Sequence, residues 1–131
     1  MTSVVEPGAA TRERKISSLA ASRAFGTFAI VFAIAAPVIY VVSEIANLPL
    51  FTYHPGTGRL DFGWAPARPN EGPAMYWYGW IATMLIGSGL VGAVASRFPN
   101  LGERTPLFLV WLLPLLALPI LAYVLMPFWT R

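Results

Sequence analysis

Three long segments that are almost free of charge restrict what this chain can fold into. They cover residues 24–46, 74–96 and 106–129, and the one charged side chain within them is Glu44, near the end of the first segment. A helix needs roughly 20 apolar residues to cross the hydrocarbon core of a bilayer, and each segment has that length. Only 11% of the residues are charged, against roughly 25% in soluble domains. The sequence therefore predicts an all-α integral membrane protein with three transmembrane helices.

The distribution of Lys and Arg predicts the orientation of these helices, because basic residues collect on the cytoplasmic side. Residues 1–23, a polar and basic segment, would share one side with residues 97–105, and the 47–73 loop would share the other with residues 130–131. The first side has six basic residues and the second has three, Arg59, Arg68 and Arg131; the six are Arg12, Arg14, Lys15, Arg23, Arg97 and Arg104. We expect a multi-pass protein of a bacterial inner membrane, with its N terminus cytoplasmic and its C terminus extracytoplasmic. The first apolar segment exceeds the roughly 7–15 residues of a signal-peptide core, which favours an uncleaved anchor.

Aromatic residues gather at the start of the second segment. Tyr76, Trp77, Tyr78 and Trp80 fall within five positions. Tyr and Trp prefer the lipid–water boundary, where the ring is in an apolar setting and the polar atom stays hydrated. We interpret the four as an interface belt at the outer boundary, with an aromatic ligand site as the alternative.

Small residues recur along the second segment at helical spacing. Helices associate in lipid by close packing of small side chains. The set predicted to form packing faces, against the other two helices or against a partner chain, is Gly79, Thr83, Gly87, Ser88, Gly92 and Ser96.

The 47–73 loop is long for a connection and rich in aromatic residues, which favours an ordered structure. Its stretch LFTYHPGTGRLDF has β-favouring residues on both sides of a Pro-Gly-Thr-Gly turn, a pattern typical of a β-hairpin. Alternate side chains share a face of a strand. We therefore expect an exposed docking face formed by Phe51, Tyr53, Phe62 and Trp64.

The sequence offers few candidates for catalytic or metal-binding residues. The chain has no cysteine and a single histidine, His54, beside the predicted turn. We expect His54 to be a solvated turn residue, because a metal site needs three or four ligands and Asp61 and Glu71 are the nearest candidates. No metal and no cofactor is expected, and a small membrane enzyme that uses His54, Asp61 and Glu71 is the least favoured possibility.

These observations favour a small non-catalytic accessory or scaffold subunit of a larger membrane complex. Its partners would be the lipid bilayer and other membrane subunits, and no nucleic acid. The alternative is a binding site for a hydrophobic small molecule, such as a quinone or a pigment, at the outer membrane boundary.

Overall fold

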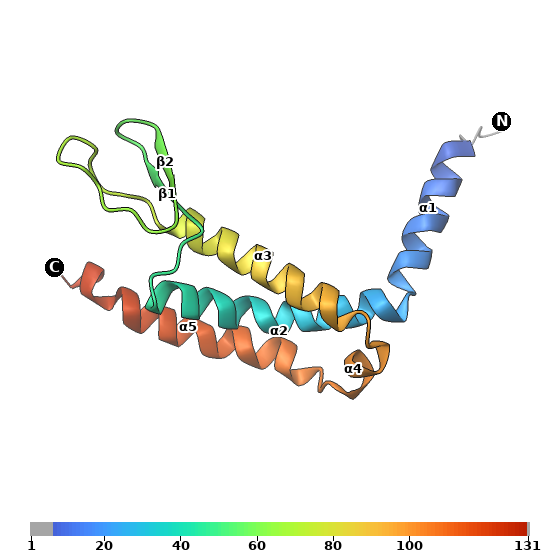
Figure 1. The fold of residues 1–131 in the computed structure, drawn as a ribbon. Coiled ribbons are helices and arrows are strands. Elements are labelled where there is room, and N and C mark those ends of the chain that lie inside the picture. The colour runs from blue at the N-terminus through green and yellow to red at the C-terminus, as the bar shows by residue number, and fades with distance from the viewer. Residues whose placement is uncertain (1–6, 131) are drawn as a thin grey trace, which may run out of the picture.

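The computed structural model describes residues 7–130 and has three long apolar helices (Figure 1). They are α2 (Arg23–Ile45), α3 (Trp77–Ala95) and α5 (Phe108–Trp129). All three are long and apolar enough to cross a membrane. A hairpin of two strands lies between α2 and α3. The predicted fold, a mostly helical chain with three candidate membrane spans, is confirmed.

Helix α2 lies in the middle of the bundle, with α3 along one side and α5 along another (Figure 1). In the described part of the chain, α3 and α5 make no extended contact with each other. Close approach of α2 and α3 depends on glycine: a β-carbon at Gly92 would lie 2.9 Å from the ring of Phe28, and one at Gly87 would lie 3.1 Å from Ile39. Gly87 and Gly92 therefore allow α3 to pack closely against α2, as small residues commonly do between membrane helices.

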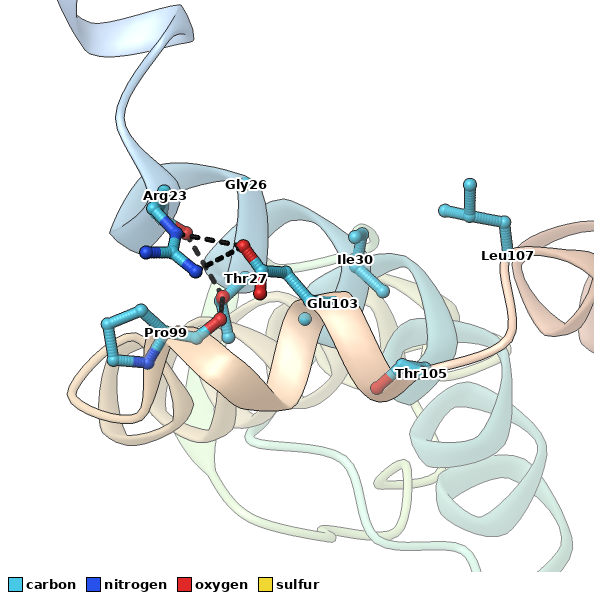
Figure 2. A pocket seen from close by; sticks show the side chains of 9 residues that line it. Arg23, Gly26, Thr27, Ile30, Pro99, Glu103, Thr105 and Leu107 are labelled. Carbon is cyan, nitrogen blue, oxygen red and sulfur yellow. Dashed lines mark hydrogen bonds and ion pairs between the residues drawn. The ribbon is translucent and has the colours of Figure 1, made fainter.

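Two further helices lie at the end of the bundle opposite the hairpin. Helix α1 (Pro7–Ala20) leaves the start of α2 at a steep angle (Figure 1). The short α4 (Pro99–Arg104) folds back on the start of α2, where the hydroxyl of Thr27 lies 3.0 Å from the carbonyl oxygen of Pro99. Figure 2 shows Arg23 and Glu103 paired beside this contact, at the wall of a pocket of about 460 Å³. Both side chains of the pair are more than half exposed, so the pair contributes little to stability.

The hairpin consists of β1 (Phe51–His54) and β2 (Arg59–Phe62), which pair in antiparallel register. Glycine at position 58 supplies the positive φ of 69° in the connecting turn, a conformation that side chains disfavour. Residues 65–75 then return to α3, and Met75 forms an isolated bridge with Tyr53 through hydrogen bonds of 2.8 and 3.3 Å. The loop is therefore an ordered element, and α3 begins at Trp77 because Met75 still belongs to it.

Candidate functional site

The two faces of the hairpin differ sharply in chemistry. Opposite pairs in the register place Thr52 with Asp61 and His54 with Arg59 on one face. Thr52 and His54 are completely buried there, under the returning segment. The expectation that His54 is a solvated turn residue is wrong, because its exposed fraction is 0%.

A bidentate ion pair joins this polar face to the returning segment. The Nε atom of Arg59 donates a hydrogen bond of 2.7 Å to Oε1 of Glu71, and its Nη2 atom donates one of 2.7 Å to Oε2. The backbone N–H of Arg68 donates to the same carboxylate at 2.9 Å, and the hydroxyl of Thr57 at 3.1 Å. These donors, with Arg59 the strongest, lower the pKa of Glu71 from 4.5 to about 2. Such charge-assisted bidentate pairs are the strongest hydrogen bonds in proteins.

The imidazole of His54 completes an outer cluster that we define as His54, Arg59, Asp61 and Glu71. Its Nε2 lies 3.2 Å from Nη2 of Arg59 and 3.3 Å from Oδ2 of Asp61, while Nδ1 lies 3.5 Å from Oε2 of Glu71. Arginine can only donate, so in its contact with Arg59 the Nε2 atom is the acceptor. Arg59 also pairs with Asp61.

The outer cluster brings together the three residues that formed the weak catalytic hypothesis, but it does so around a guanidinium. The cation of Arg59 pairs with both carboxylates and offsets one of their two negative charges. Within residues 7–130, no three acidic or histidine side chains are grouped to hold a metal ion. The arrangement suits a structural lock that fixes the hairpin to the returning segment. Sequence reasoning counted Arg59 and Arg68 only as charges; the hairpin register, which places Arg59 opposite His54, is the signal that it missed.

The other face of the hairpin is apolar and points away from the protein. Phe51 pairs with Phe62, and Tyr53 pairs with Leu60. Phe62 is 88% exposed and Leu60 is 54% exposed, whereas Phe51 and Tyr53 are half-buried. These four residues differ from the expected docking set in having Leu60 in place of Trp64, and from here on the name docking face refers to them. Trp64 leaves this face after Gly63, whose φ is 72°, and its ring stacks on that of Tyr76 at 6.5 Å.

The small residues of α3 lie mainly in contacts within the chain. Gly79 faces the backbone of Phe51, and the hydroxyl of Thr83 donates to the carbonyl oxygen of Leu48 at 3.0 Å. Gly87 and Gly92 face α2, and Ser88 is completely buried. The hydroxyl of Ser96, by contrast, donates a hydrogen bond to the nearby carbonyl oxygen of Ala93. The structure thus gives this set a use in internal packing.

The four aromatic residues that were predicted to form an interface belt divide into two pairs. Trp77 and Tyr78 are about half exposed at the first turn of α3. Tyr76 and Trp80 stack at 6.3 Å. With Trp77 they line an outer cleft of about 420 Å³, whose remaining lining residues are Glu44, Ala74, Met75, Val124, Leu125 and Phe128. The cleft opens between the outer ends of α3 and α5, which do not pack together.

No family model, no curated protein and no solved structure matches the chain.

Proposed function

We propose that this chain is a non-catalytic accessory subunit of a larger membrane protein complex, and that its docking face binds an extracytoplasmic part of a partner subunit. One observation carries the proposal. The hairpin buries its polar face and turns its apolar face outward, with Phe62 88% exposed. Exposed apolar patches on ordered elements mark interaction sites.

The rigidity of the hairpin supports this function. The outer cluster holds the polar face against the returning segment, and the β-carbon position of Gly56 lies against the backbone of Glu71, 2.9 Å from its carbonyl carbon. The backbone of the docking face is therefore held in place before a partner binds. A preorganised surface loses less conformational entropy on association, so its aromatic side chains serve as anchors at small cost.

The pairing and burial within the outer cluster are the basis for proposing a non-catalytic role. His54 is completely buried and Glu71 nearly so, and both carboxylates of the outer cluster are paired with Arg59. General acid–base catalysis needs a group within hydrogen-bond reach of a substrate. His54 and Glu71 offer a substrate no such access, and Asp61, which is partly exposed, is paired with Arg59.

The docking hypothesis predicts a specific defect when Phe62 is replaced by alanine. Buried aromatic anchors dominate protein interfaces, so Phe62→Ala is expected to weaken association by about 2 kcal/mol or more. The measurement is the retention of a defined partner subunit after mild detergent extraction, by native gel and mass spectrometry at matched expression.

A matched control is available at the other end of the molecule. Phe98 is 64% exposed beside α4, so Phe98→Ala removes another largely exposed ring, far from the hairpin. The proposal expects the Phe98 variant to keep the partner that the Phe62 variant loses. A Phe62 variant that keeps every partner of the unaltered chain contradicts it.

We also propose the orientation in which the hairpin is extracytoplasmic and the N terminus is cytoplasmic. The excess of basic residues at the α1 and α4 end supports it. A reporter enzyme that is active only outside the cytoplasm is expected to be active when fused after Arg131 and silent when inserted at Asn100. Activity at Asn100 with silence at Arg131 contradicts the orientation and moves the docking face to the cytoplasmic side.

A further inference from the structure

Glu44 is a charged residue inside a candidate membrane span, which is an unusual position for a carboxylate. Apart from Arg23, the first residue of α2, it is the one charged side chain in the three candidate membrane spans. It lies one residue before the end of α2 and is half-buried. Ionisable residues in membrane spans are costly and generally have a functional partner. A partner for Glu44 therefore needs to be identified.

Among residues 7–130, no cationic side chain pairs with Glu44. Its side chain accepts no hydrogen bond and forms no ion pair there; the ion pairs involve Arg23 with Glu103, and Arg59 and His54 with the acidic residues of the outer cluster. The carboxylate instead lines the outer cleft. Within residues 7–130 the carboxylate has no counter-charge, so the cleft can admit a cation that pairs with it.

The walls of the outer cleft indicate which kind of cation fits. Tyr76, Trp77 and Trp80 come from the start of α3, and Leu125 and Phe128 come from the end of α5. Aromatic faces attract organic cations through their quadrupole, most strongly when water is excluded. A metal ion is a poor fit, because Ca²⁺ and Mg²⁺ prefer about six or more oxygen ligands and the cleft presents one carboxylate.

We propose that the outer cleft binds the ammonium group of an amphiphile, with the cation between Glu44 and the aromatic rings and the alkyl chain against Val124, Leu125 and Phe128, the residues of α5 that line the cleft. The volume of about 420 Å³ is sufficient for such a group, since small-molecule pockets start at roughly 300 Å³. A neutral ring such as a quinone leaves the carboxylate unpaired, so the charge of Glu44 favours the cation. The ammonium group belongs either to a lipid headgroup or to a free lipophilic amine.

The test uses the full chain in nanodiscs made of phosphatidylglycerol, which has no ammonium group. Octyltrimethylammonium and octanol, which share the alkyl chain and differ in charge, are titrated while tryptophan fluorescence is recorded, and empty nanodiscs correct for partitioning. The expected result is saturable binding of the cation at least tenfold tighter than that of octanol. Glu44→Gln is expected to remove this preference, whereas Glu103→Gln, at the opposite end of the bundle, keeps it.

Each outcome decides between alternatives. Equal cation binding by the unaltered chain and the Glu44 variant overturns the proposal, and so does tighter binding of octanol or of a short-chain quinone. A repeat in phosphatidylcholine nanodiscs distinguishes the two sources when each affinity is expressed relative to that of the Glu44 variant in the same lipid, because this ratio cancels the attraction of the cation to the anionic surface. A lipid headgroup as natural occupant competes and lowers the ratio, while a site for free amines gives the same ratio in both lipids. The thermal unfolding of the Glu44 variant, compared with that of the unaltered chain, verifies that it is folded.

Discussion

Replacing Gly79 with alanine is expected to detach the hairpin from α3 and to lower the stability of the outer half of the molecule. A β-carbon at this buried position would collide with the backbone oxygen of Phe51 and would lie 2.5 Å from Cβ of Pro49. The carbonyl oxygen of Gly79 also accepts a hydrogen bond of 3.1 Å from the backbone N–H of Leu50. Overpacking typically costs 1–3 kcal/mol, and we expect about 3 kcal/mol here because one of the obstructing atoms belongs to the backbone.

Gly89→Ala is the matched control for this prediction. Gly89 lies in the same helix, and a β-carbon there meets nothing within 4 Å. Alanine is the better helix former by roughly 0.5–1 kcal/mol, so this variant is expected to be neutral or slightly stabilised.

Both glycine variants are compared by thermal unfolding in detergent. Trp64, Trp77 and Trp80 lie in or beside the hairpin, so tryptophan fluorescence reports on this region. Equal unfolding temperatures for the two variants contradict a tight contact between the hairpin and α3.

The features that the sequence predicted correctly are those determined by local chemistry. Apolar length alone identifies the three candidate spans, and β-favouring residues around Pro55 and Gly58 identify the hairpin. The strand alternation also correctly placed Phe51, Tyr53 and Phe62 on one face. Each of these depends on residues close together along the chain.

The features that were missed depend on contacts between distant residues. His54 was expected in water because a histidine beside a turn is usually exposed, and nothing local reveals that residues 65–75 cover it. The Arg59–Glu71 pair joins positions 12 residues apart, across an irregular segment with no periodicity. Likewise, β2 ends at Phe62, so the strand pattern does not extend to Trp64, whose ring stacks on that of the more distant Tyr76. The composition of the loop was sufficient to predict order, but the covered face could be assigned only from the three-dimensional structure.

Acid is expected to open the hairpin through protonation of Glu71. Its pKa is about 2 in the folded loop and 4.5 ordinarily, so the unfolded loop binds the proton more readily. The stabilisation by the Arg59–Glu71 pair is therefore complete above pH 4.5 and is lost progressively as the pH falls toward 2. The measurement is amide hydrogen exchange of residues 52–75, corrected for intrinsic exchange rates, between pH 6 and pH 2.

Two variants separate Glu71 from other acid effects. Glu71→Gln removes the buried carboxylate with which Arg59 forms its bidentate pair and leaves the partly exposed guanidinium with Asp61 alone, so fast exchange of the loop is expected already at pH 6 with little further change on acidification. Glu103→Gln removes a carboxylate whose ion pair is exposed at the opposite end of the bundle, and its loop is expected to follow the profile of the unaltered chain. If the unaltered loop exchanges equally fast at pH 6 and pH 2, or if the Glu71 variant keeps the full pH dependence, the outer cluster does not hold the hairpin closed.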